Sequence, residues 1–497
     1  MKIDFKNEFD LNAINMIFGR TKSSISALAY DSKKVKKNTA FFCITGANTD
    51  GHQYIKHAID QGASVIIGTK TSLLEKNASR FQETTFISVK DVKTFMADCA
   101  ALFYKKSYTQ LSTFAVTGTN GKTTVVSYIH SLPNHLNVST GSIGTAGIWD
   151  DESKLDLEHS THTTPEANDL LNALDVFHKD GLQAAAIEVT SIAIELQRIE
   201  GLLFDVGIHT NLTSEHLDFH STFENYKQAK MKLFKQVRTA IVNVDDPGMA
   251  EDILNDFKGP TITYSLEKNA DFCAKNIEIK RDGTHFDLHI YEYHAHIHVP
   301  VYGEFNISNL LAAISACLYL NIPPRLIAGA AENVKNARDR FEVYQGYADY
   351  TLILDFAHTP EGLGKVVETA RQLDHNKLIL LITGVGLRDP RQRPELAQAV
   401  EGKAEKIVVS VDHPGYFDKQ EIADDVVEGF QKRTKNIHVH LDREEAIIKS
   451  LSLAEKGDIV LITGLGSVGY QVIKGENIPY SDKEVITRYF KNQSTRA

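Results

Sequence analysis

The sequence has few cysteines and no long apolar segment, and both absences exclude classes of protein. Its 497 residues include four cysteines, Cys43, Cys99, Cys273 and Cys317, and no C-x-x-C pair. Zinc or redox sites of that kind are excluded, and reduced, mostly buried thiols are expected. No window holds the roughly 18 uninterrupted apolar residues that a membrane-spanning helix needs. The first residues are acidic where a secretion signal has its apolar core, so we expect a cytoplasmic protein without a membrane partner.

Positive charge is also in deficit. Lys and Arg total 54 against 64 Asp and Glu, which gives a net charge of −10. This balance disfavours nucleic acid and anionic lipid as partners. Any ligand that carries phosphate must therefore be held by a local structure. Apolar residues make up 42% and charged residues 24% of the chain, the proportions of a globular protein, so extended disorder is excluded.

The length predicts about three domains, at roughly 100–200 residues each. Short apolar runs alternate with helical patterns, which indicates parallel sheets and an α/β fold. We predict a small N-terminal α/β domain at 1–107, a central parallel-sheet domain with a phosphate loop at 108–336, and a C-terminal Rossmann-like doubly wound domain at 337–497. Alternating residues from about Ala270 to Val301 predict antiparallel strands within the central domain.

The strongest motif is TGTNGKTT, Thr117 to Thr124, between the apolar run TFAV and the helical pattern VVSYIHSL. Its glycines let backbone N–H groups face a phosphate, and a helix N-terminus adds about half a positive charge. Lys122 would reach the terminal phosphates, and the Thr123 hydroxyl would bind Mg²⁺. The motif therefore predicts a nucleoside triphosphate site. It departs from the generic loop at Val116, where a further glycine is usual.

Two further polar residues follow apolar runs of the central domain. Glu188 ends AAAIEV, and His216 follows FDVGIHTN within LTSEHLDFH. The carboxyl ends of parallel strands meet at one edge of a sheet, so these side chains could converge on Mg²⁺. Because Mg²⁺ prefers oxygen ligands, a capping or packing role for His216 is an equal alternative.

Six motifs, in order along the chain, resemble the Mur ligases. They are TGTNGKTT, TTPE at 163–166, EVTS at 188–191, TNLTSEHLDFHSTFENYKQAK at 210–230, GEFNISN at 303–309 and DFAHTPEGL at 355–363. With DSKKV and GANTDGHQYI near the N-terminus, they most resemble the branch that extends UDP-N-acetylmuramoyl-L-alanyl-D-glutamate (UDP-MurNAc-dipeptide). The resemblance implies ATP-dependent formation of an amide bond between the D-glutamate and a free third amino acid, through an acyl phosphate, in peptidoglycan synthesis. We expect a monomer.

The resemblance also implies roles for individual residues. Catalytic roles fall on Lys122, Glu188, His216 and Lys230. ATP contacts fall on Gly118, Thr119, Asn120, Gly121, Lys122, Thr123, Thr124, Asn309, Arg340, Asp355 and His358. Ligands of Mg²⁺ are Thr123, Glu188, His216 and, if it is carbamylated, Lys230. Contacts to the UDP substrate fall on Asp31, Ser32, Asp50, Gly51, His52, Thr163, Thr164, Ser191 and Arg198. Contacts to the incoming amino acid fall on Arg388, Asp412 and His413.

The chain departs from the family pattern at two places. Ile192 stands where family members have a histidine, so one polar partner of the site is absent. Members that add diaminopimelate carry D-N-P-R and a later K-G-H-E, whereas this chain has Asp412-His413-Pro414-Gly415 and lacks the later motif at 464–471. Loss of the arginine clamp costs on the order of 1.5–3 kcal/mol, which disfavours diaminopimelate. Members that add L-lysine also lack that arginine, which favours L-lysine, but their acidic residue in the later segment is absent here too, so the side chain of the amino acid stays open. A paralogue with a different precursor or acceptor and a non-catalytic UDP-precursor-binding protein stay open.

A histidine-rich segment lies outside these motifs. His294, His296 and His298 recur at period two, which places them on one face of a strand. Three imidazoles could bind zinc, but the sequence offers no visible fourth ligand. We therefore interpret this segment as an exposed sheet face.

Overall fold

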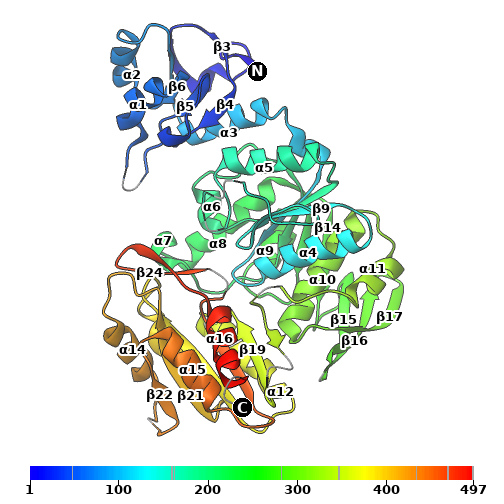
Figure 1. Cartoon of the computed structure of the whole chain (residues 1–497). Coiled ribbons are helices and arrows are strands. Elements are labelled where there is room, and N and C mark those ends of the chain that lie inside the picture. The colour runs from blue at the N-terminus through cyan, green and yellow to red at the C-terminus, as the bar shows by residue number, and fades with distance from the viewer. Residues whose placement is uncertain are drawn as a thin grey trace. The chain divides into compact units, whose positions relative to one another are not determined.

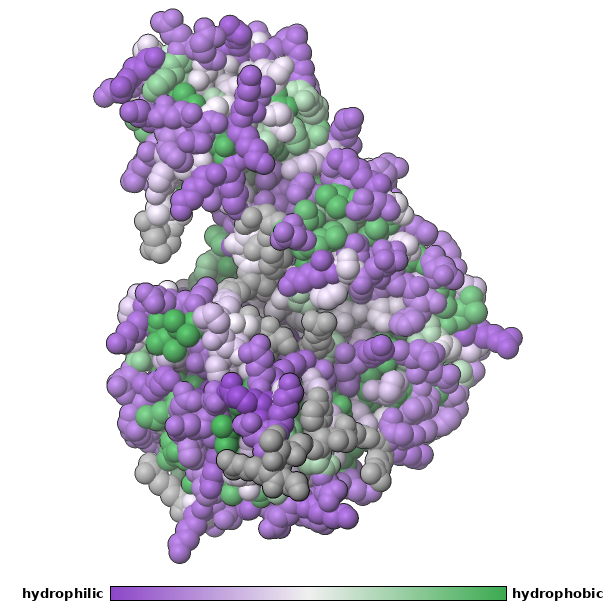
Figure 2. All heavy atoms as spheres, in the orientation of Figure 1, coloured by the Kyte–Doolittle hydropathy of each residue, from purple (hydrophilic) through white to green (hydrophobic). Residues whose placement is uncertain are grey.

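The computed structural model describes residues 1–46, 49–157, 160–161, 163–280, 282–337, 339–344, 348–432, 434–466 and 469–494 (Figure 1). The chain divides into two compact units. The first contains Met1–Gly118, Pro133–Ile241 and Glu251–Thr261, and the second contains Thr119–Leu132, Val242–Ala250 and Ile262–Ala497. Among the described residues, the helices are all too short or too polar to cross a membrane. Hydrophilic residues cover most of the face in Figure 2, and apolar residues form small separate patches there.

The first unit begins with a five-stranded sheet. Its order is β2 (Ile14–Phe18), β7 (Thr85–Val89), β6 (Ala63–Gly68), β5 (Thr39–Phe42) and β4 (Ala27–Ala29). All pairs are parallel except β2 with β7. The helices of this sheet are α1 (Ile55–Asp60), α2 (Thr71–Ala78) and α3 (Val92–Phe103), and a small antiparallel ribbon joins β1 (Lys2–Asp4) to β3 (Lys22–Ser24). Phe41, Ile66 and Phe86 lie in its buried core.

The same unit contains the strand that precedes the phosphate loop. The strand order is β10 (Gly147–Trp149), β9 (Thr140–Gly144), β11 (Ala184–Glu188), β8 (Ser112–Thr117), β12 (Phe204–His209) and β13 (Val237–Asn243). Strands β9, β11, β8 and β12 pair in parallel, so the residues after β8 and β11 emerge at one edge. The helices are α5 (Ala167–Lys179), α6 (Ser191–Glu195), α7 (Leu217–His220), α8 (Phe223–Met231) and α9 (Ala250–Asp256).

The second unit includes the helix after the phosphate loop, α4 (Lys122–His135), and a four-stranded ribbon. The ribbon runs β14 (Thr261–Ser265), β15 (Phe272–Lys280), β16 (Gly283–Ile290) and β17 (Tyr293–Val299). Strands β15 to β17 are antiparallel, which confirms the strands predicted between Ala270 and Val301. Helices α10 (Glu304–Tyr319) and α11 (Pro324–Ala331) follow.

The C-terminal part of the second unit is a six-stranded sheet covered on both faces. Its order is β18 (Glu342–Tyr344), β19 (Thr351–Asp355), β23 (Ile459–Thr463), β20 (Leu378–Val385), β21 (Lys406–Asp412) and β22 (Ile437–Val439). Only the pair of β18 with β19 is antiparallel. The helices are α12 (Pro360–Gln372), α13 (Gln392–Val400), α14 (Lys419–Glu428), α15 (Arg443–Ser452) and α16 (Asp482–Ser494). A last hairpin joins β24 (Tyr470–Ile473) to β25 (Glu476–Pro479).

Side chains along these strands point alternately to the two faces of the sheet, and each face has its own hydrophobic core. In β20, Leu380 and Ile382 point to the core that includes α12 and α13, and Ile379 and Leu381 point to the core that includes α15 and α16. This confirms the predicted doubly wound sheet and the α/β class. All four cysteines are free and buried, as expected. The exact domain boundaries at 107/108 and 336/337 stay predictions.

Candidate active site

The phosphate loop begins at Gly118, directly after β8. Its φ is +152°, and a Cβ there would collide with the Thr210 hydroxyl, so only glycine fits. The Lys230 ammonium, on α8, donates a hydrogen bond to the Gly118 carbonyl at 2.8 Å. Lys230 is 1% exposed. The predicted catalytic lysine is therefore buried and fixes the first backbone carbonyl of the loop.

The rest of the loop lies in the second unit. Gly121 has a φ of +87°, and a Cβ there would collide with the Asn309 side-chain oxygen on α10. Lys122 opens α4, and its ammonium donates to the Thr119 carbonyl at 2.8 Å. The Arg340 guanidinium donates to the Thr123 hydroxyl at 3.5 Å. Asn309 and Arg340 thus both contact the phosphate loop, and their roles in binding ATP stay predictions. Asn120 and Thr124 complete the loop, and Thr124 is buried.

Glu188 ends β11 and is 1% exposed. One carboxylate oxygen accepts from the Thr145 N–H at 2.8 Å, and the other accepts from the Thr145 hydroxyl at 3.3 Å. The Thr164 hydroxyl donates to the Glu188 carbonyl at 2.8 Å. A Cβ at Gly144 would collide with the Glu188 carboxylate, so that position also requires glycine. The side chain of Glu188 is therefore held in one orientation at the edge where β8 ends.

Three basic side chains of the 210–230 motif lie around the buried Tyr226 ring. The Lys230 ammonium lies 4.6 Å from the centroid of the Tyr226 ring, and the rings of His216 and His220 lie 6.3 Å and 5.3 Å from it. The His220 Nε2 is 3.0 Å from the Ser191 hydroxyl, and burial lowers the pKa of His220, which favours the neutral imidazole. Sequence reasoning missed Tyr226 and His220. Their signals were their spacings, four residues before Lys230 and four after His216.

The N-terminal candidates for the UDP substrate lie in the segments that follow two neighbouring parallel strands, β4 and β5. Asp31 follows β4 and accepts from the Lys33 N–H at 2.9 Å, next to Ser32. Asp50 accepts from the His52 N–H at 3.0 Å and from its Nδ1 at 2.7 Å. The hydrogen bond from the Lys70 ammonium, and after it those from His52, lower the pKa of Asp50. A Cβ at Gly51 would lie 2.8 Å from the Ile44 nitrogen, so the loop requires glycine there.

The other UDP candidates lie around Glu188. The Thr163 hydroxyl is 3.2 Å from the Thr145 hydroxyl, which also contacts Glu188. The guanidinium of Arg198 donates to the Glu166 carboxylate at 2.9 Å and to the Thr164 carbonyl at 3.2 Å. Glu166 was missed as a site residue, although it closes the TTPE motif. An anionic substrate group would have to compete with Glu166 for the Arg198 guanidinium.

The C-terminal candidates for ATP gather after β19. The Asp355 carboxylate accepts from the Phe341 N–H at 2.7 Å and from the Ala357 N–H at 2.6 Å, and burial raises its pKa to about 6. The Arg340 guanidinium lies 4.8 Å from the Phe356 ring centroid, and the centroid of the His358 ring lies 4.9 Å from that of Phe356.

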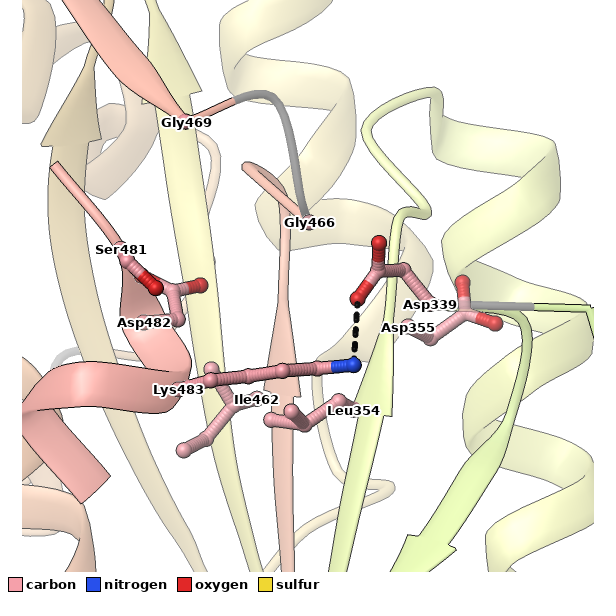
Figure 3. A pocket seen from close by; sticks show the side chains of 9 residues that line it. All are labelled: Asp339, Leu354, Asp355, Ile462, Gly466, Gly469, Ser481, Asp482 and Lys483. Atoms are coloured by element: carbon pink, nitrogen blue, oxygen red, sulfur yellow. Dashed lines mark ion pairs between the residues drawn. The ribbon is translucent and has the colours of Figure 1, made fainter. Parts of the chain in front are cut away.

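A cavity of about 90 Å³ adjoins this cluster and is lined by Asp339, Leu354, Asp355, Ile462, Gly466, Gly469, Ser481, Asp482 and Lys483. In Figure 3 the Lys483 side chain extends toward the carboxylate of Asp339, at 3.8 Å. The cavity therefore has acidic walls and one basic side chain.

The candidates for the incoming amino acid share one edge of the C-terminal sheet. Asp412 ends β21 opposite Val385 of β20, and Arg388 follows β20. Asp412 is 1% exposed, and burial raises its pKa, so its carboxylate is poorly placed to attract a substrate ammonium. The His413 ring accepts from the Val472 N–H at 2.9 Å. Gly415, with a φ of +60°, donates to the Val472 carbonyl at 3.0 Å.

Hairpin β24–β25 thus fixes the loop that replaces D-N-P-R. Residues 467 and 468, in the segment that lacks K-G-H-E, lie outside the described residues.

Three family domains match this chain. Residues 24–104 match "Mur ligase family, catalytic domain", residues 116–317 match "Mur ligase middle domain", and residues 339–466 match "Mur ligase, glutamate ligase domain". A curated relative from Clostridioides difficile is 36% identical over 479 residues, covers 96% of each chain, and is named UDP-N-acetylmuramoyl-L-alanyl-D-glutamate--2,6-diaminopimelate ligase.

Solved structures agree. One with the same ligase name has a TM-score of 0.67 and 27% identity, and covers 95% of each chain. A MurF ligase from Thermotoga maritima in complex with ADP has a TM-score of 0.66 at 18% identity, covers 95% of this chain and 98% of its own, and shows the shared fold alone.

The names of the relatives differ from one expectation. Both the curated relative and the structure at 27% identity are named as ligases for 2,6-diaminopimelate, whereas we expected L-lysine. That expectation rested on the missing arginine at Gly415 and on the missing K-G-H-E motif at 464–471. A single contact worth on the order of 1.5–3 kcal/mol changes affinity and does not by itself define the substrate.

Proposed function

We propose that this chain, which belongs to the Mur ligase family, adds 2,6-diaminopimelate to the D-glutamate of UDP-MurNAc-dipeptide. Membership makes it an ATP-dependent, amide-bond-forming ligase of peptidoglycan synthesis, of the MurE type. The observation that carries the proposal is full-length similarity to a ligase of that name, at 36% identity over 96% of the chain. The phosphate loop, with Gly118, Gly121 and Lys122, supports the proposed use of ATP.

The reaction needs an activated carboxylate because a carboxylate is a poor electrophile in water. In the first step a D-glutamate oxygen attacks the γ-phosphorus of ATP, and ADP leaves. In the second step the amine attacks the acyl carbon, loses a proton, and phosphate leaves with the bridging oxygen. The loop N–H groups and the Lys122 ammonium would bind the phosphates. To do so, Lys122 must give up its hydrogen bond to the Thr119 carbonyl.

The residues that the resemblance assigns to Mg²⁺ suit this ion in part. When bound, it neutralises charge on the phosphates and orients them. Glu188 and the Thr123 hydroxyl offer the oxygen ligands that Mg²⁺ prefers. Lys230 would do so only as a carbamate, because its ammonium is a donor and cannot ligate a cation. His216 offers nitrogen, a less suitable ligand, and its position against Tyr226 supports a packing role equally well.

The loop at Gly415 predicts how strongly diaminopimelate is held. Arg388 can bind the α-carboxylate, as the resemblance implies, but the distal carboxylate has no arginine from this loop. We therefore propose that diaminopimelate binds about ten- to a hundredfold more weakly here than in relatives that carry D-N-P-R.

A screen of phosphate release tests the proposal. The full chain is incubated with ATP, Mg²⁺ and UDP-MurNAc-dipeptide, and with diaminopimelate, L-lysine, L-ornithine or each other amino acid in turn. We expect release with diaminopimelate, and none with Lys122→Ala. Release only with another amino acid would support a paralogue. Binding of UDP-MurNAc-dipeptide without release for any amino acid would support a non-catalytic binding protein.

A further inference from the structure

The antiparallel ribbon β15–β17 lies at the end of its sheet, and β17 is the edge strand (Figure 1). Phe286, Leu288, Ile297 and Val299 are buried on one face. The polar residues between them share the other face, because side chains alternate along a strand. The sequence-based prediction of an exposed face at β17 is therefore confirmed, with His294 and His296 exposed and His298 half-buried.

Each of the three histidines of β17 lies opposite a polar residue of β16. The three cross-strand pairs are His285 with His298, Asp287 with His296, and His289 with His294. The rings of the first pair lie 4.5 Å apart, and those of the last pair lie 4.3 Å apart. The sequence alone could not show these partners, because they come from the neighbouring strand.

The Asp282 carboxylate lies close to the Nε2 atoms of both rings of the first pair. The Nε2 of His285 lies 3.4 Å from one oxygen of Asp282, and the Nε2 of His298 lies 3.7 Å from the other. One ligand atom from each of the three residues lies within 4.8 Å of the others. Among the described residues this is the one such group of three.

These distances suit a tetrahedral metal ion. Two ligand atoms about 2.0–2.1 Å from zinc, at the tetrahedral angle, lie about 3.3–3.4 Å from each other. The two imidazoles approach different oxygens of Asp282, and the three ligand atoms lie within 4.8 Å of one another, so side-chain rotation alone can bring them to these separations. The His298 Nε2 would exchange its 3.1 Å contact with the Asp282 carbonyl oxygen for the ion. Two imidazoles and one carboxylate also form a ligand set that Zn²⁺ and other late first-row ions prefer over Mg²⁺.

We propose that Asp282, His285 and His298 bind a Zn²⁺-like divalent transition-metal ion, with water in the fourth position. The side chains are 64%, 20% and 38% exposed, so an ion and its water can reach them. Glu278 faces His285 on β15 and adds negative charge beside the site. The bound ion joins β16, β17 and the turn at Asp282, and so stabilises the edge of the sheet. The proposal is independent of the ligase activity.

Metal titration of the full-length chain tests this site. The chelator-treated protein receives Zn²⁺, or Co²⁺ as a spectroscopic probe, and binding stoichiometry and Tm are measured. We expect one ion per chain at this site, a rise in Tm, and a tetrahedral Co²⁺ spectrum. The double variant His285→Gln/His298→Gln and the variant Asp282→Asn should each bind at least about tenfold more weakly and lose the Tm shift.

The matched control is the double variant His289→Gln/His294→Gln. It removes an imidazole pair of the same face and similar ring separation, and it leaves Asp282 in place. It should bind as the wild type does. Equal weakening in both double variants would indicate unspecific binding to surface histidines and would overturn the proposal. So would a wild-type chain that binds no better than the His285→Gln/His298→Gln variant, with circular dichroism confirming that each variant is folded.

Discussion

Gly121→Ala is the sharpest perturbation of the phosphate loop. An added Cβ would lie well within 3.0 Å of the Asn309 oxygen, a separation that real Cβ contacts do not show. The φ of +87° adds strain for any L residue, about 1–2 kcal/mol. Rotation of the Asn309 amide can relieve the clash, but the loop can relieve the φ strain only by leaving the conformation that turns its N–H groups toward a phosphate. The cost then appears as lost stability, weaker nucleotide binding, or a share of each.

Calorimetric titration with ADP and with a non-hydrolysable ATP analogue, together with urea unfolding, measures both shares. If the loop relaxes, nucleotide affinity should fall about five- to thirtyfold, which corresponds to 1–2 kcal/mol. Gly329→Ala is the matched control, because Gly329 lies in α11 and a Cβ added there would have no atom within 4 Å, so the substitution should leave binding unchanged. Wild-type affinity and wild-type stability together in Gly121→Ala would refute the assignment of this loop.

Three further substitutions test separate parts of the site. Lys230→Ala should abolish phosphate release and remove the hydrogen bond to the Gly118 carbonyl, at about 1–3 kcal/mol of stability. Acetate should restore part of the activity if Lys230 is carbamylated. The control Lys232→Ala, at a side chain that is 52% exposed, should remain active. Gly415→Arg should lower the KM for diaminopimelate about ten- to a hundredfold. The control Gly415→Ala carries the same backbone strain without a guanidinium and should not lower the KM. An unchanged KM for Gly415→Arg would contradict our interpretation of the loop. Burial raises the pKa of Asp355 from 3.8 to about 6, so its protonated form adds stability that is fully present below pH 3.8 and is lost as pH rises through about 6. Relative to Asp355→Asn, the wild type should therefore lose up to about 3 kcal/mol of unfolding free energy across that range in urea titrations, and parallel pH profiles would count against it.

The fold could be predicted from sequence because strand and helix patterns are local. The phosphate loop is also local, since Gly118, Gly121 and Lys122 are neighbouring parts of one turn. The contact of Lys230 with the Gly118 carbonyl could not be predicted, because 112 residues separate them and no pattern encodes that distance. The same holds for the partner of Arg198, since its pairing with Glu166 depends on how α6 and the TTPE segment pack.

The amino-acid pocket was the least predictable part. Asp412 was expected to contact the incoming amino acid, and its burial could not be predicted, because only three-dimensional structure shows exposure. The expectation of L-lysine had a different weakness. One absent arginine was given more weight than similarity along the whole chain, although a single clamp accounts for only a small part of binding.

Transfer of a heavy-oxygen label tests the central claim most directly. The full chain receives ATP, Mg²⁺, diaminopimelate and UDP-MurNAc-dipeptide whose D-glutamate side-chain carboxylate carries the label, and mass spectrometry follows both products. We predict that one labelled oxygen appears in each phosphate released and that the peptide gains one diaminopimelate residue. Tripeptide formed with unlabelled phosphate would contradict activation of the carboxylate by the nucleotide held at Lys122.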